Sequence, residues 1–122
     1  MPKTVLVVED YTDVRTMMRI LIKRHGYEVV EASDGYEAVE KTVQFHPDLI
    51  LMDLALPIMD GVTATKIIRE IEGFDNVSIV ALTAYRNTSF DKAIEAGFDN
   101  VLLKPLHFEN LESFLNQYLA SP

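Results

Sequence analysis

The chain has 122 residues, of which 48% are hydrophobic and 25% charged, as in a single globular domain and unlike a disordered chain. Its net charge of −8 would repel a nucleic-acid backbone, and the absence of cysteine excludes disulfides and thiolate metal sites. No apolar run approaches the roughly 20 residues that span a bilayer, and the first residues lack a signal peptide's apolar stretch. We therefore expect one cytoplasmic domain over residues 1–122, without a membrane segment and without direct nucleic-acid binding.

Short apolar runs alternate with amphipathic stretches along the whole chain. The runs are rich in Val, Ile and Leu and predict strands at residues 4–8, 28–32, 49–52, 78–82 and 100–103. In the second run Glu28 and Glu31 flank two valines, which is typical of a charge-protected edge strand. Three of the runs are apolar on both faces, as expected for central strands, and the second is expected at an edge.

The stretches between the runs have the apolar spacing of helices. In the first, Val14, Met18 and Ile22 repeat every four residues, and Gly26 follows where a C-terminal cap belongs. Three more stretches end near Pro47, Gly73 and Gly97, and the fourth helix opens with a capping-box-like Thr88-Ser89. The last predicted helix has a buried face, formed by Phe108, Leu111, Leu115, Tyr118 and Leu119.

Five strand–helix units in strict alternation predict an α/β fold with a parallel sheet and helices on both faces. Right-handed crossovers leave few arrangements, and one of the two common ones is the flavodoxin-like (βα)5 doubly wound sandwich with strand order 2-1-3-4-5. Ligands bind such sheets outside the carboxyl ends of the strands. Functional residues are therefore expected where the strands end.

Charged and polar residues stand at four of these strand ends. Glu9 and Asp10 follow the first strand, and Asp53 ends the third; the fourth and fifth end at Thr83 and Lys104. Two carboxylates about 4 Å apart repel each other by roughly 4 kcal/mol at an effective dielectric constant near 20. A divalent cation would relieve this repulsion, and hard oxygen ligands without His or Cys favour Mg²⁺.

These residues give the sequence a resemblance to the response-regulator receiver (CheY-like) family over essentially the whole chain. The matching motifs stand in the family's order at the strand ends: Glu9-Asp10, Asp53 with Pro57 and Met59-Asp60-Gly61, Thr83-Ala84, and Lys104-Pro105. The flavodoxins share the fold but cradle a phosphate in a Ser/Thr-rich first loop, whereas this chain has an acidic loop there. Haloacid-dehalogenase-type phosphatases have a second acid where this chain has Ala55.

The resemblance implies a role for each matching residue. Asp53 would accept a phosphoryl group from a phosphohistidine or a small acyl phosphate. Asp10, Asp53 and the backbone carbonyl of Ala55 would bind Mg²⁺, with Glu9 acting directly or through water. Lys104 and Thr83 would contact the phosphoryl oxygens, and the Lys104–Pro105 peptide is expected to be cis.

The resemblance also implies a two-component signalling switch. The chain would catalyse only its own phosphorylation and dephosphorylation, and so would not be an enzyme with a separate substrate. The expected donors are a sensor histidine kinase or a histidine phosphotransfer protein. The downstream protein target would bind the face formed by the fourth helix, fifth strand and fifth helix, and phosphorylation is expected to promote weak dimerisation.

Two features of the sequence leave questions open. Val101 replaces the aromatic residue that usually stands three positions before the lysine. The coupling between phosphorylation and the change from the inactive to the active state is therefore either weaker than usual or carried by Thr83 and its loop alone. A receiver-like module that binds proteins without phosphorylation therefore stays as the alternative. Ala55 and Tyr85 occupy positions that tune phosphoryl-group loss in the family, and we expect a long-lived phosphoaspartate because Ala55 cannot orient water.

Other polar and aromatic residues have simpler interpretations. Asp60-Gly61 is interpreted as a turn that leads into a helix. Lys23, Arg24 and Arg69 are interpreted as solvated helix residues. The phenylalanines at 90, 98 and 108 are expected mainly in the core, with some of them contributing to the face of the fourth helix, fifth strand and fifth helix. The three histidines are expected at the surface.

Overall fold

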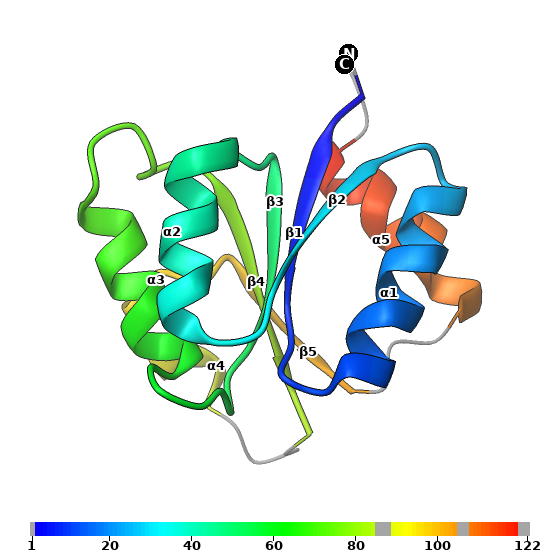
Figure 1. Ribbon diagram of the computed structural model, residues 1–122. Helices are drawn as coiled ribbons and strands as arrows, with labels where there is room; N and C mark the ends of the chain where they lie inside the picture. The colour runs from blue at the N-terminus through cyan, green and yellow to red at the C-terminus, as the bar shows by residue number, and fades with distance from the viewer. Residues whose placement is uncertain (1, 85–88, 105–107, 120–122) are drawn as a thin grey trace.

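The computed structural model describes residues 2–84, 89–104 and 108–119, apart from the side chains of residues 108 and 109 (Figure 1). The five strands are β1 (Thr4–Val8), β2 (Glu28–Ala32), β3 (Leu49–Asp53), β4 (Ser78–Thr83) and β5 (Asn100–Leu103). The five helices are α1 (Thr12–Arg24), α2 (Gly35–Phe45), α3 (Gly61–Glu70), α4 (Phe90–Ala96) and α5 (Phe108–Leu119). The expectations for Tyr85, Thr88, Pro105, His107 and the Phe108 side chain lie outside the described residues.

The strands form one parallel sheet in the order β2-β1-β3-β4-β5, with helices on both faces. In Figure 1, α1 and α5 cover one face, and α2, α3 and α4 cover the other. This arrangement confirms the predicted doubly wound α/β fold. β3 and β4 each extend one residue beyond the predicted run, and so include Asp53 and Thr83.

The core consists of two clusters, one on each face of the sheet. Four residues of β1 and all five of β3 are buried, because helices cover both faces of these central strands. β2 lies at an edge and buries only Ala32 fully, which agrees with its glutamate-flanked sequence. The central strands are thus held firmly up to their carboxyl ends.

Local capping contacts fix where the helices begin. Asp60 accepts a hydrogen bond from the Thr63 amide at 2.8 Å, which confirms that it leads into a helix. Ser89 accepts one from the Lys92 amide at 3.2 Å and caps α4. At its other end α4 stops at Gly97, whose φ of 112° favours glycine.

One of the simpler interpretations was wrong, and another was confirmed only in part. Arg69 is not a solvated residue, because its side chain is only 17% exposed and makes hydrogen bonds to several backbone carbonyls. Phe90 is 53% exposed, since it opens α4 on the outer side, whereas Phe98 is buried as expected. Lys23 and Arg24 are exposed, as expected. No helix in the described part of the chain is long and apolar enough to cross a bilayer.

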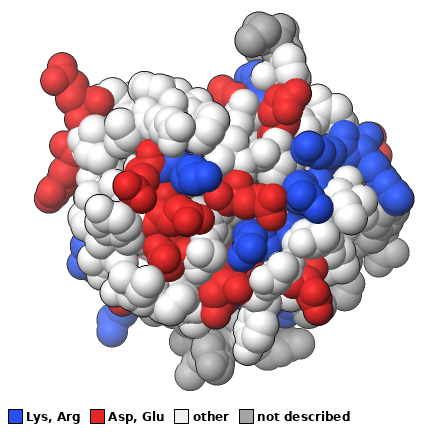
Figure 2. Space-filling model, viewed as in Figure 1, with Lys and Arg blue, Asp and Glu red and all other residues white. Residues whose placement is uncertain are grey.

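The basic residues are not evenly scattered over the surface. Figure 2 shows Lys and Arg side chains gathered over α1, while Asp and Glu predominate on the rest of that face. Within α1, Arg15 and Arg19 both pair with Glu31 of β2, at 3.2 and 3.5 Å. The sequence reading missed this clustering, although the spacing of four residues in a helix signals a shared face.

Candidate functional site

The polar residues predicted at the strand ends converge at one end of the sheet. Hydrogen bonds continue the pairing past the last strand residues, from the Glu9 amide to Ala32 O at 3.0 Å and from the Lys104 amide to Thr83 O at 2.8 Å. The Leu54 amide bonds in the same way to Leu82 O at 3.0 Å. The backbone just after β1, β3 and β5 is therefore held in position by the same kind of hydrogen bonds as the strands.

Lys104 joins the two buried carboxylates of the site. Its Nζ lies 2.7 Å from Glu9 Oε1 and 2.7 Å from Asp53 Oδ2. The side chain of Glu9 is fully buried, that of Asp53 is 5% exposed and that of Lys104 is 22% exposed. Buried charges need such partners, since leaving one unpaired costs several kcal/mol. The other oxygen of Asp53, Oδ1, accepts the Ala55 amide at 3.0 Å.

The electrostatics of the site disfavour a second negative charge beside Asp53. Burial raises the pKa of Glu9 above its usual range; the hydrogen bond from Lys104 opposes this shift, and the neighbouring Asp53 and Asp10 add to it. Burial by itself would lower the pKa of Lys104, but its hydrogen bonds to Asp53 and Glu9 outweigh that effect and raise the pKa. Lys104 therefore stays positively charged, but its single charge cannot neutralise both Glu9 and Asp53.

The three carboxylates could together hold a cation. Glu9, Asp10 and Asp53 each offer an oxygen atom, and these atoms all lie within 4.8 Å of one another. Asp10 is exposed to solvent while the other two are buried, so a metal ion could enter from the Asp10 side and keep water ligands there. An all-oxygen donor set with room for water fits Mg²⁺. The predicted carbonyl ligand on Ala55 stays a prediction.

A cavity of about 530 Å³ opens above Asp53. Its walls include Thr83 and Lys104, the two residues predicted to contact the phosphoryl oxygens, and Asp10, a predicted Mg²⁺ ligand. Ala55 and Ala84 also line it, together with the larger side chains of Tyr11 and Leu54. The cavity is large enough for a phosphoryl group and a small donor such as acetyl phosphate. Glu9 is fully buried and does not line this cavity, but it contacts two residues that do, through the Lys104 ammonium and the Tyr11 amide.

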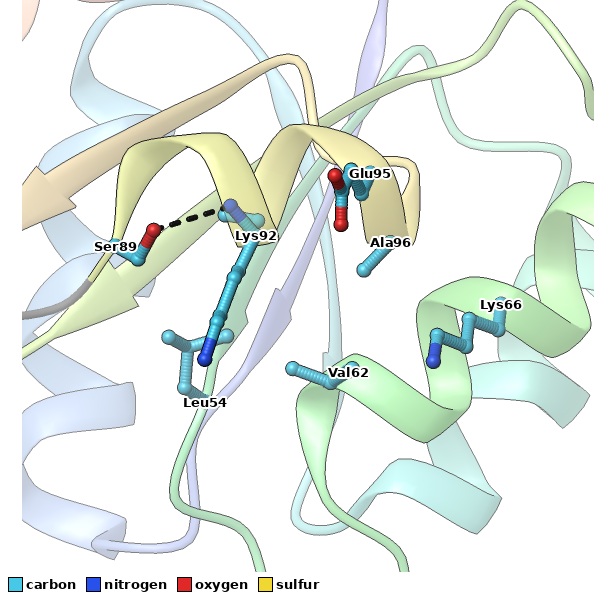
Figure 3. A pocket seen from close by; sticks show the side chains of 8 residues that line it. Leu54, Val62, Lys66, Ser89, Lys92, Glu95 and Ala96 are labelled. Carbon is cyan, nitrogen blue, oxygen red and sulfur yellow. Dashed lines mark hydrogen bonds between the residues drawn. The ribbon is translucent and has the colours of Figure 1, made fainter.

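A second cavity, of about 570 Å³, lies between α3 and α4. Figure 3 shows Lys92 extending from α4 toward Leu54, with Val62 of α3 on the opposite wall. Leu54 lines both cavities and directly follows Asp53. α4, a helix of seven residues, lines this cavity with Lys92, and its N-cap residue Ser89 lines it as well.

Val101 lies in β5 opposite Ala81 of β4 and is partly buried. Its side chain packs against the core cluster on the α4 side of the sheet. The residue that departs from the family pattern is therefore a packing residue at the edge of the core.

Several residues that support the site were not predicted. The Arg15 guanidinium donates to the Glu9 carbonyl at 2.8 Å and fixes the turn after β1. A Cβ on Gly61 would overlap the Asp53 carbonyl oxygen, and one on Gly35 would overlap the Met59 carbonyl, so both positions exclude larger residues. The sequence offered two signals for these supporting residues: an arginine six residues after Glu9, and glycines at positions 35 and 61.

The fold and the site together define a doubly wound α/β domain with an aspartate, two further acids and a lysine at the switch point of its sheet. The family model for the response regulator receiver domain matches residues 5–116. The chain therefore belongs to the response regulator receiver family of two-component systems.

Individual relatives match over nearly their whole length. The chain is 33% identical to chemotaxis protein CheY of Bacillus subtilis, covering 98% of this chain and 99% of that protein. It is 32% identical to the polar-differentiation response regulator DivK of Brucella ovis, covering 98% of each. The receiver domain of sensor histidine kinase PA1611 from Pseudomonas aeruginosa, solved with magnesium in its active site cleft, has a TM-score of 0.89 at 33% identity, over 99% of this chain and 100% of that one.

Proposed function

We propose that this receiver is a phosphorylation-dependent switch whose phosphoacceptor is Asp53. The observation that carries the proposal is the position of this carboxylate, which lies at the floor of the cavity beside Lys104 and within reach of two further acids. Asp53 is also the acid of this cluster that ends a strand, where it is buried and its backbone pairs with Leu82 of β4. Phosphoryl transfer depends mainly on such positioning and on charge neutralisation.

Asp10, Asp53 and the carbonyl of Ala55 would hold Mg²⁺, with Glu9 acting directly or through water. When bound, Mg²⁺ would neutralise the carboxylates and the negative charge of the incoming phosphoryl group. The magnesium ion in the cleft of the PA1611 receiver supports this assignment for a related chain.

An Asp53 oxygen would attack phosphorus while the bond from phosphorus to the donor breaks. From a phosphohistidine the electron pair of the P–N bond goes to the imidazole; from acetyl phosphate that of the P–O bond goes to acetate. Lys104 would move its hydrogen bond from Asp53 to a phosphoryl oxygen, since its Nζ already borders the cavity. Thr83, which lines the same cavity, would donate its hydroxyl to another oxygen.

The chain would turn over only its own phosphoryl group and so act as a switch. A sensor histidine kinase or a histidine phosphotransfer protein would be the donor, and the face of α4, β5 and α5 would bind the downstream protein. The cavity between α3 and α4 supports this switch, because it leaves α4 room to shift when the residues around Asp53 rearrange.

The test is incubation with acetyl phosphate followed by intact-mass measurement, with and without Mg²⁺. We expect the wild type to gain one phosphoryl group only with Mg²⁺, and Asp53→Asn to gain none. Asp48→Asn is a matched control, because Asp48 is an exposed acid that bonds the Thr4 amide away from the site. No gain under conditions that modify a known receiver would favour a phosphorylation-independent binding module instead.

A further inference from the structure

Ile58 combines two features that are unfavourable for folding. Its φ angle is +67°, in the left-handed region that β-branched residues rarely adopt, and its side chain is 86% exposed. The Met59 amide bonds back to the Pro57 carbonyl at 2.7 Å, so that Ile58 is the central residue of a strained three-residue turn. His46 also has a positive φ, but it ends a helix and stacks on Phe74 at 4.9 Å.

The surrounding loop explains the backbone of Ile58 but not its side chain. The Gly35 amide bonds to the Met59 carbonyl at 3.0 Å, and the Gly61 amide bonds to Leu54 O at 3.2 Å, so the loop is held on both sides of Ile58. This framework forces the turn. Glycine or asparagine would fit the turn with less strain and without exposing an apolar side chain. An isoleucine here therefore needs a reason outside the fold.

The position of the loop indicates what that reason is. Figure 1 shows the loop from β3 to α3 at the same end of the sheet as the turn after β1 and the end of β5, where the cavity above Asp53 opens. Tyr11, on the wall of that cavity, is 69% exposed. A protein that brings a phosphohistidine to Asp53 must cover the loops around the cavity, whereas acetyl phosphate need not.

We propose that Ile58 is a docking residue for the phosphohistidine-bearing protein, with its exposed side chain becoming buried when that protein covers the phosphoacceptor cavity. This inference rests on the proposed function. It assigns to Ile58 no contact with the phosphoryl group itself. The strain and the exposure are then the cost of presenting an apolar anchor beside the reaction site, as strained positions at functional sites often are.

The test measures three quantities for Ile58→Asn, Ile58→Leu and the control Val43→Asn, an exposed apolar residue on α2. They are the folding equilibrium constant, the phosphorylation rate with acetyl phosphate and Mg²⁺, and the transfer rate from a phosphorylated histidine phosphotransfer domain. Because asparagine relieves the strain, we expect Ile58→Asn to raise the folding constant roughly fivefold. Loss of the buried contact should slow transfer from the domain roughly tenfold. Ile58→Leu and Val43→Asn should transfer like the wild type.

The acetyl phosphate arm separates this inference from the proposed function. If the wild type takes no phosphoryl group from acetyl phosphate, the proposed function fails. If it does, but Ile58→Asn accepts from the domain as fast as the wild type, only the role of Ile58 fails. A folding constant lowered by Ile58→Asn would also overturn the inference, because the side chain would then serve the fold. So would a wild type that accepts no faster from the domain than from acetyl phosphate.

Discussion

Lys104 Nζ lies 2.7 Å from Asp53 Oδ2, a contact that joins the end of β5 to the end of β3 across the intervening strand β4. The same ammonium lies 2.7 Å from the fully buried Glu9. One positive charge therefore partly neutralises two buried carboxylates, and a cation bound at the acidic cluster would neutralise them further. Stability and metal binding should consequently be linked in this protein.

Replacement of Lys104 should destabilise the metal-free protein. Lys104→Met leaves Glu9 and Asp53 without their counter-charge, which should cost about 3 kcal/mol of unfolding free energy. Urea unfolding in EDTA and in Mg²⁺ measures the loss, which should be smaller with Mg²⁺ because the ion supplies positive charge. The matched control is Lys23→Met, at an exposed position in the last turn of α1. An equal loss in both media would contradict the linkage.

Asp10 should have opposite effects with and without metal. In EDTA, Asp10→Asn removes one of three clustered negative charges, so the melting temperature should rise. In Mg²⁺ the variant should lose the stabilisation that the wild type gains, since a ligand is missing. Thermal unfolding across a Mg²⁺ titration measures both effects, with Asp13→Asn in the first turn of α1 as the control. If both variants gain equally from Mg²⁺, Asp10 is not a ligand.

The raised pKa of Glu9 predicts a pH dependence of the metal-free protein. The folded state holds the Glu9 proton more tightly than the unfolded state, so folding is favoured most while Glu9 is protonated. This contribution is lost as the pH rises through the unfolded value, near 4.5, toward the higher folded value. Unfolding free energy of the wild type relative to Glu9→Gln should therefore fall with rising pH in EDTA. Glu28→Gln, at an exposed edge position, should show no such trend.

Arg69 should be essential to stability although it lies away from the site. Its guanidinium bonds the carbonyls of Gly97 and Val77 at 2.8 and 2.6 Å and the Asp99 carboxylate at 3.0 Å. Arg69→Met should cost about 3 kcal/mol, because these partly buried acceptors lose a charged donor. Chemical denaturation measures the loss, and Arg24→Met at an exposed site should change little. A loss below about 1 kcal/mol, the usual size for surface ion pairs, would show that the network is dispensable.

The phosphorylated state should persist unless residue 55 can orient water. Ala55 is exposed, lines the cavity and has no polar side-chain atom. Ala55→Asn should therefore speed loss of the phosphoryl group, which radiolabel release after removal of the donor would follow. Ala84→Ser, on the same cavity wall, tests whether any added polar group has this effect. Rapid loss in the wild type, unchanged by Ala55→Asn, would count against a long-lived phosphoaspartate.

Most of the fold could be predicted from the sequence because apolar runs mark the strands, and the polar residues of the site stand at the ends of these runs. Apolar runs located the strands, and in a parallel sheet the residues after those runs must meet at one end. Asp53 and Lys104 were therefore brought together by topology alone. Their contact through one ammonium shared with Glu9 needed atomic positions, since side-chain rotamers decide it.

The supporting residues were harder to predict because their partners are backbone atoms. Arg69 bonds backbone carbonyls of two loops, and carbonyls are present at every residue, so nothing in the sequence indicated that this arginine was not solvated. Gly61 was interpreted as part of a turn, and its close approach to the Asp53 carbonyl depends on how α3 meets β3. The strain at Ile58 likewise arises from hydrogen bonds that hold the loop on both sides.

The most direct test of the central claim is chemical location of the phosphoryl group. After phosphorylation with acetyl phosphate and Mg²⁺, borohydride reduction converts an aspartyl phosphate into homoserine, and peptide mass spectrometry identifies the position. We predict homoserine at residue 53 and an unmodified Asp10, with no conversion when the donor is omitted. Conversion at Asp10, or none in a protein that has gained the mass of a phosphoryl group, would contradict the account.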